Sequence, residues 1–275
     1  MNEMVSMPLL SYDLKSRLKN FIIWTIISVC LFILIVVMFT NLLNAGLPEF
    51  IADMLSSVPT SVSGGEQTSE LPDFKDFGVN FGVCMQLMLI VGCVYASFLG
   101  ASANTGSRGD NDITFIYSMP VTRICTVLTS YFAQVVILFF YNLAIFAVAL
   151  GVLYSNNKMS FISRIALAVL AFMLIEVIYL SISFLLATFM NTSSQAASIS
   201  AVIVTITVLF GFVGSLSPSL NTLTFFSPYK YISVYSIVSG GSSLFLIGII
   251  AGVVMSIISI MISCARYNKI DFLLD

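Results

Sequence analysis

The chain has 275 residues, of which 59% are hydrophobic and 9% are charged, and its formal net charge is -2. Soluble domains carry about 25% charged residues, so this composition excludes a soluble globular protein and indicates an integral membrane protein. The sequence contains no histidine, which excludes a serine–histidine–aspartate triad, a cysteine–histidine pair and a histidine-ligated zinc. We therefore expect no catalytic, cofactor-binding or metal-binding site in this chain.

Residues 1–20 are predicted to form a cytoplasmic tail that contains an amphipathic helix. Leu10, Leu14 and Leu18 recur at every fourth position, and three lysine or arginine residues lie among them. A basic amphipathic helix of this kind suits the inner surface of a membrane. The alternative is a solvated tail.

Six apolar runs are long enough to cross a bilayer core of about 30 Å, which takes roughly 20 residues of helix. They cover residues 21–43, 80–103, 124–153, 161–190, 196–216 and 243–264. We therefore predict an all-α integral membrane protein with six transmembrane helices in residues 21–264. The first run is too long for the apolar region of a signal peptide and no cleavage motif follows it, so we expect it to remain as a span.

Lysine and arginine residues are distributed unequally between the two predicted sides of the membrane. The tail at 1–20, the connection at 104–123 and the tail at 265–275 carry seven, whereas the longer connections on the other side carry four. The positive-inside rule then predicts that both termini are cytoplasmic and that the loop at 44–79 is extracellular. The compact spans and low charge suit a bacterial plasma membrane.

The polar interruption GDNDITFIYSMPVTR between the second and third runs contains a short predicted helix at residues 109–120. An acidic residue such as Asp112 suits the start of a helix, and Ile113 and Ile116 lie on one helical face. Pro120 closes the segment, because proline disfavours helix at the residue before it. An apolar face in the cytoplasm must meet lipid headgroups or a partner protein.

The connection before the last run, residues 217–242, is too apolar for a solvated loop and too interrupted by proline for a span. Ser227 followed by Pro228 predicts a helix start, because serine is a favoured N-cap and proline is favoured at the first helical position. Gly240 and Gly241 are expected to end the segment. We predict short helices that dip into the outer leaflet, with their backbone covered by protein because lipid cannot satisfy its hydrogen bonds.

Glu176 is the only acidic residue inside a predicted span, and Tyr179 and Ser183 lie on the same partly polar stripe. An ionised carboxylate there needs a partner or water. Two interpretations remain open: these residues line a translocation path, or Glu176 is a protonated or hydrogen-bonded structural residue. In the second and sixth runs, small residues recur at every fourth position, which permits close helix approach, more often within one subunit than between two.

Three motifs resemble those of type-2 ABC transporter permeases. ITFIYSMPVTR resembles a signature in which a leucine-rich turn precedes Ser-Leu-Pro-Val-Ser-Arg. The matching positions are Ser118, Pro120, Val121 and Arg123, with Met119 in place of leucine and Thr122 in place of serine. FFSPYKYI resembles the Ser-Pro-Phe-x-Tyr-Phe element before the last span. ARYNKIDFLL resembles the closing aromatic-x-x-Arg-Asp-Ile element, with Lys269 and Ile270 where Arg-Asp is expected.

This resemblance implies that residues 109–120 form a coupling helix that docks on a cytosolic ATPase subunit. The residues expected at this contact are Asp112, Ile113, Phe115, Ile116, Met119, Pro120 and Arg123. The resemblance also implies outer re-entrant helices in residues 217–242, which include Ser227, Pro228 and Tyr229. The chain has no G-x-x-x-x-G-K-[ST] phosphate loop, so ATP and magnesium are expected in a separate ATPase subunit.

The leading hypothesis is the permease subunit of an ATP-driven ABC exporter. It would pair with a second six-span subunit, identical or different, above two ATPase subunits. The substrate class would be an amphipathic peptide, a lipid or a hydrophobic drug, and we favour a peptide. The chain lacks the catalytic residues of an intramembrane protease, and it has no basic cluster that would indicate nucleic-acid binding. The alternatives are an ion-coupled secondary transporter, for which Glu176 gives thin support, and a sensor or immunity protein on the same fold.

Overall fold

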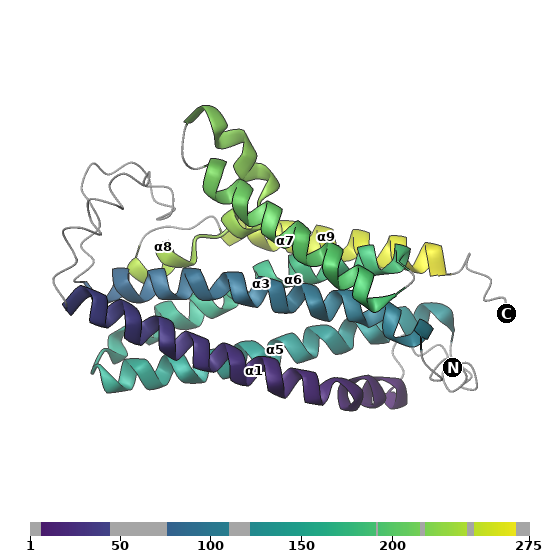
Figure 1. Cartoon of the computed structure of the whole chain (residues 1–275), viewed down its shortest axis with the longest axis horizontal. Helices are drawn as coiled ribbons and strands as arrows, with labels where there is room; N and C mark the ends of the chain where they lie inside the picture. The colour runs from purple at the N-terminus through teal and green to yellow at the C-terminus, as the bar shows by residue number, and fades with distance from the viewer. Residues whose placement is uncertain are drawn as a thin grey trace.

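Figure 1 shows a computed structural model of the chain, in which long helices run side by side. The structure describes residues 7–44, 76–109, 122–190, 192–214, 218–240 and 245–267. Six helices in these residues are long and apolar enough to cross a membrane, and none of the residues in these ranges forms a strand. The prediction of a helical chain with six apolar spans is confirmed, and these helices are consistent with a multi-pass membrane protein.

The six long helices follow the predicted order along the chain. Their bounds are Met7–Asn44 (α1), Phe77–Gly109 (α3), Arg123–Ser155 (α5), Ile162–Phe189 (α6), Ser193–Gly214 (α7) and Phe245–Tyr267 (α9). Some extend well beyond the predicted apolar runs, as α3 does by continuing from residue 103 to Gly109. The apolar pattern therefore located the helices but not their ends.

The N-terminal segment is the first part of α1 and not a separate helix. α1 continues from Met7 to Asn44 without a break, although the sequence predicted a distinct interfacial helix before residue 21. Its only proline, Pro8, is in the first turn, where proline is tolerated, and no glycine follows to interrupt the helix. That the first turns lie on a membrane surface stays a prediction.

A tight turn separates α5 from α6. Asn157 adopts a left-handed conformation with φ of 54°, which asparagine tolerates better than most residues. The Lys158 amide donates to the Leu153 carbonyl oxygen at 3.0 Å, and the short helix η2 (Met159–Phe161) leads into α6. The turn explains how only a few polar residues separate two spans.

Small residues bring α6 into close contact with α3 and α9. A Cβ on Gly100 of α3 would collide with the Leu180 carbonyl oxygen of α6. On the α9 side, the Ser256 hydroxyl lies 3.1 Å from the Ser181 hydroxyl of α6, within hydrogen-bonding distance. The small-residue stripes of the second and sixth runs therefore pack within one subunit, as predicted.

Candidate functional site

The connection that carries the predicted coupling helix joins two helices at the end of the bundle that holds the N-terminus. α1 begins at this end, α3 ends there and α5 begins there (Figure 1). Thr122 caps the start of α5, because its side-chain oxygen accepts a hydrogen bond from the Cys125 amide at 3.3 Å. The two helices therefore hold both ends of the connection at one end of the bundle.

Most of the predicted coupling residues lie outside the described residues. The structure describes α3 up to Gly109 and the chain again from Thr122. The residues in the gap are Asp112, Ile113, Phe115, Ile116, Met119 and Pro120. Arg123 is the first residue of α5, so this helix begins where the motif ends. The coupling helix stays a prediction.

Polar contacts hold the start of α1 against α3 and α5. The Arg17 guanidinium donates from Nη2 to the Ser102 carbonyl oxygen at 2.8 Å and from Nη1 to the Ser102 hydroxyl. Asp13 lies one turn earlier on α1, is attracted to Arg17 and accepts a hydrogen bond from the Ser130 hydroxyl at 2.9 Å. Arg17, which the sequence assigned to the membrane surface, therefore also anchors α1 to α3.

The region before the last span consists of three short helices. They are η3 (Pro218–Phe226), η4 (Pro228–Lys230) and α8 (Val234–Ser239). Ser227 is the N-cap of η4 and Pro228 its first residue, as predicted, although the Ser227 side chain makes no capping hydrogen bond. Its hydroxyl instead lies close to Gly211 of α7. α8 ends at Gly240, whose φ of 95° is the left-handed conformation that glycine favours after a helix.

Gln86 of α3 ties this outer segment to the core. Its main-chain carbonyl oxygen accepts a hydrogen bond from the Tyr229 hydroxyl at 3.1 Å, and its side-chain Oε1 accepts one from the Tyr235 main-chain amide at 3.2 Å. Residues 234–238 are buried, so the backbone here is covered by protein, as membrane depth would require. Gln86 was not among the residues predicted from the sequence, although a glutamine inside an apolar run is itself a signal of a polar contact.

The outer segment also contains a partly buried cation and two exposed aromatic residues. Burial lowers the pKa of Lys230, at the end of η4, to about 8. Phe225 and Phe226 at the end of η3 are 73% and 65% exposed. In Figure 1, η3 lies beside α7 and projects from the rest of the bundle. This projecting pair of helices therefore presents apolar side chains outward.

Glu176 lies inside the bundle and is fully buried. Its Oε2 accepts a hydrogen bond from the side-chain amide of Asn142 in α5, and its Oε1 lies close to Gly92 of α3. Within the described part of the chain, Oε1 has no hydrogen-bond partner. These contacts join α6 to α5 and α3, and an unpaired buried charge would be costly there. Both interpretations of Glu176 stay predictions. Asn142, a polar residue in the middle of the third run, was not among the residues predicted from the sequence.

Tyr179 and Ser183 share the buried face of α6 with Glu176. The Tyr179 hydroxyl lies 3.0 Å from the Thr207 hydroxyl of α7, within hydrogen-bonding distance, and Ser183 lies beneath Gly100. The predicted stripe is therefore one face of α6, and that face packs against neighbouring helices of the same subunit. Its role as a translocation path stays a prediction.

The chemistry available at these sites is hydrogen bonding and close packing. Within the described ranges, no group of three or more cysteine, aspartate or glutamate side chains could hold a metal ion. No protein-family model matches this chain, and no curated protein matches it.

Proposed function

We propose that this chain is the membrane-spanning subunit of an ATP-driven exporter whose ATPase is a separate polypeptide. The observation that carries the proposal is the sequence ITFIYSMPVTR in the connection between α3 and α5. Both helices meet this connection at the end of the bundle where the basic first turns of α1 lie. A short apolar helix held there would be presented to a cytosolic partner.

The proposed mechanism depends on rigid attachment of this connection to the bundle. Arg17 binds Ser102 near the end of α3, and Asp13 binds Ser130 near the start of α5. A displacement of the connection by ATP-driven closure of the ATPases would therefore move α1, α3 and α5 together. The free energy for this movement would come from a difference in the affinity of the ATPase for the arrangements of α1, α3 and α5 before and after the displacement.

The exporter would contain two six-span subunits with the substrate path between them. The projecting pair α7 and η3 supports this proposal, because Phe225 and Phe226 offer an apolar surface that a second subunit could cover. The subunits could be identical or different. The proposed substrate class is an amphipathic peptide, a lipid or a hydrophobic drug, because the exposed faces of the bundle are apolar and aromatic.

Co-purification tests the proposal most simply. The tagged chain is expressed in its own host, and the ATPase retained on it is quantified by mass spectrometry. We expect Phe115→Asp and Ile116→Asp to lower retention at least about tenfold, since burying a charge in an apolar contact costs more than about 1.4 kcal/mol. Thr114→Asp adds the same charge beside these residues and should retain more ATPase. Retention at the wild-type level in both test variants would refute the coupling assignment.

An ion-coupled transporter is the second candidate, and the buried Glu176–Asn142 pair is the observation that favours it. An intramembrane carboxyl with a polar partner is a frequent feature of ion pathways. Transport by reconstituted protein would then need an ion gradient and no ATP. Transport that continues without ATP and stops when the gradient is collapsed would favour this candidate over the exporter.

A further inference from the structure

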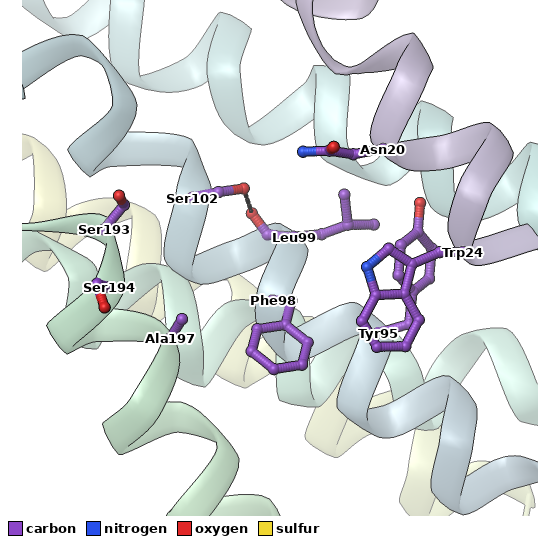
Figure 2. A pocket seen from close by; sticks show the side chains of 9 residues that line it. All are labelled: Asn20, Trp24, Tyr95, Phe98, Leu99, Ser102, Ser193, Ser194 and Ala197. Carbon is purple, nitrogen blue, oxygen red and sulfur yellow. Dashed lines mark hydrogen bonds between the residues drawn. The ribbon is translucent and has the colours of Figure 1, made fainter. Parts of the chain in front are cut away.

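A cavity of about 380 Å³ lies between α1, α3 and α7 near the N-terminal end of the bundle. Figure 2 shows α3 between the other two helices, with Trp24 of α1 beside Tyr95 and Phe98 of α3. The Trp24 ring centroid lies 5.6 Å from that of Tyr95 and 5.5 Å from that of Phe98. The cavity is large enough for part of a small amphipathic ligand.

Polar and apolar groups occupy opposite ends of this cavity. α1 and α7 begin, and α3 ends, at the same end of the bundle. Asn20, Ser102 and Ser193 lie nearer that end than the aromatic residues on the same walls. At 1.5 Å per residue, Asn20 precedes Trp24 by about 6 Å and Ser102 follows Tyr95 by about 10 Å along their helices. The cavity is therefore amphipathic along the long axis of the bundle.

Positive charge lies at the polar end. Arg17 is one turn before Asn20 on α1, and its guanidinium binds Ser102, which lines the cavity. Lys15 and Lys19 are exposed on the same turns of α1. Asp13 is the acidic residue that interacts with Arg17, and it is also hydrogen-bonded to Ser130 of α5. Among the described residues of the first turns of α1, three basic residues outnumber one acidic residue, so these turns bring net positive charge to the polar end.

A buried hydroxyl also lines the cavity. Tyr95 is 1% exposed, and its hydroxyl has no hydrogen-bond partner among the residues that the structure describes. Figure 2 shows this hydroxyl at the edge of the ring nearest Asn20. Tyr95 therefore carries a buried hydrogen-bonding group beside the cavity that the described part of the chain leaves unpaired.

We propose that this cavity holds one anionic phospholipid of the leaflet that surrounds the N-terminal end of the bundle. The phosphate binds at the level of Asn20, Ser102 and Ser193, near Arg17, and the upper part of one acyl chain packs beside Trp24 and Phe98. The order of groups along the cavity matches the order in a phospholipid, and the positive end selects an anionic headgroup. The proposal needs the bundle to span a membrane but does not need the chain to be an exporter.

Trp24 is the only tryptophan in the chain, so tryptophan fluorescence reports on the surroundings of this one cavity-lining residue. The purified full-length chain is placed in phosphatidylcholine nanodiscs that contain a minor, equal fraction of brominated phosphatidylglycerol or brominated phosphatidylcholine. We expect about fivefold enrichment of the anionic quencher at Trp24, since one basic residue near anionic lipid contributes about that factor. Equal quenching by the two lipids would overturn the proposal.

Two pairs of variants separate a built site from general surface charge. Arg17→Gln should abolish the enrichment, whereas Lys19→Gln removes the same charge from an exposed side chain and should lower the enrichment only in part. Ala197→Leu fills the cavity from α7 and should also abolish it, whereas Ser198→Leu adds the same side chain on the exposed face. Equal losses within either pair would overturn the site. Each sample is first checked for a single elution peak and a wild-type thermal midpoint, and Ala197→Leu decides the test if Arg17→Gln fails that check.

Discussion

The central helices α3 and α6 and the outer helices α1, α7 and α9 are all apolar enough to cross a membrane but differ in what surrounds them. In the most apolar stretch of each helix, 67% of the residues are buried in α3 and 56% in α6. The corresponding shares are 11% in α1, 28% in α7 and 22% in α9. Helices in lipid gain no hydrophobic free energy from packing on each other, so the central pair must be held by close contact and hydrogen bonds. Gly92 and Gly100 bring α3 and α6 into close contact, and the hydrogen bonds of Gln86 and Glu176 join α3 to α8 and α6 to α5.

This difference predicts where the bundle is sensitive to substitution. The outer helices present isoleucine, leucine and phenylalanine outward, and similar apolar side chains can replace these at little cost. The central pair depends on particular small or polar residues that apolar side chains cannot replace. Unfolding can be followed with a thiol-reactive dye, because Cys84, Cys93 and Cys125 are free and buried in the folded chain.

The largest effect is expected at Gly100. Gly100→Val should lower the free energy of unfolding by about 3 kcal/mol, because the new side chain must displace the backbone of α6 near Leu180. Gly151→Ala in α5 is the matched control, since a Cβ there meets nothing within 4 Å. It should be neutral or slightly stabilising, because alanine favours helix more than glycine. Equal thermal midpoints for Gly100→Val and the wild type would contradict the central role of α3–α6 contact.

An intermediate effect is expected at the Glu176–Asn142 pair. Asn142→Leu should lower the free energy of unfolding by about 2 kcal/mol, because it leaves the buried carboxyl without its amide donor. Adding Glu176→Met to this variant should recover part of the loss, since both polar partners are then gone. A double variant less stable than Asn142→Leu would contradict the pairing.

The same pair also separates the two interpretations of Glu176. If Glu176 lines a translocation path, Glu176→Gln changes transport and leaves folding and assembly intact. If it is structural, Glu176→Gln keeps a hydrogen-bonding side chain at the buried position and leaves transport unchanged. Unchanged transport by this variant, at wild-type expression, would therefore remove the functional assignment.

The smallest effect concerns the outer segment and depends on pH. Burial disfavours the charged form of Lys230, so its pKa falls from 10.5 to about 8 in the folded chain. Below pH 8, Lys230 is charged in the folded chain, and its burial lowers the free energy of unfolding. Between pH 8 and 10.5, Lys230 is neutral in the folded chain but still charged in the unfolded chain, so the free energy of unfolding should rise with pH. After allowance for solvent, we expect a rise of about 1 kcal/mol.

The difference between variants isolates this contribution from other titrating groups. Lys230→Met should be more stable than the wild type at pH 7, and the two should converge as the pH rises. Lys158→Met, in the exposed turn before α6, is the control for the loss of a lysine charge elsewhere in the chain. A constant difference between Lys230→Met and the wild type from pH 7 to pH 10 would contradict the assignment.

Local patterns in the sequence predicted much of this structure. Hydropathy located the six helices, Ser227 with Pro228 marked the start of η4, and Gly240 marked the end of α8. Each of these signals acts over a few neighbouring residues, which is why a single sequence suffices. The small residues at every fourth position also predicted close contact, although not which helix would make it.

Contacts between distant residues could not be predicted in the same way. The hydrogen bond between Gln86 and Tyr235 joins residues that are 149 positions apart in the sequence, and the one between Arg17 and Ser102 joins residues 85 positions apart. Mean hydropathy does not separate central from outer helices, because the central α6 is more apolar than the outer α7 and α9. The expected break after residue 20 was also absent, because the onset of the apolar run changes which side chains face lipid and does not interrupt backbone hydrogen bonds.

The proposed partnership with an ATPase is tested most directly by ATP hydrolysis in nanodiscs that hold the complex purified through this chain. We expect the wild-type complex to hydrolyse ATP, and an equal amount of the Ile116→Asp chain to bring at least about tenfold less ATPase activity. A wild-type preparation that contains no ATPase activity, or activity unchanged by Ile116→Asp, would contradict it.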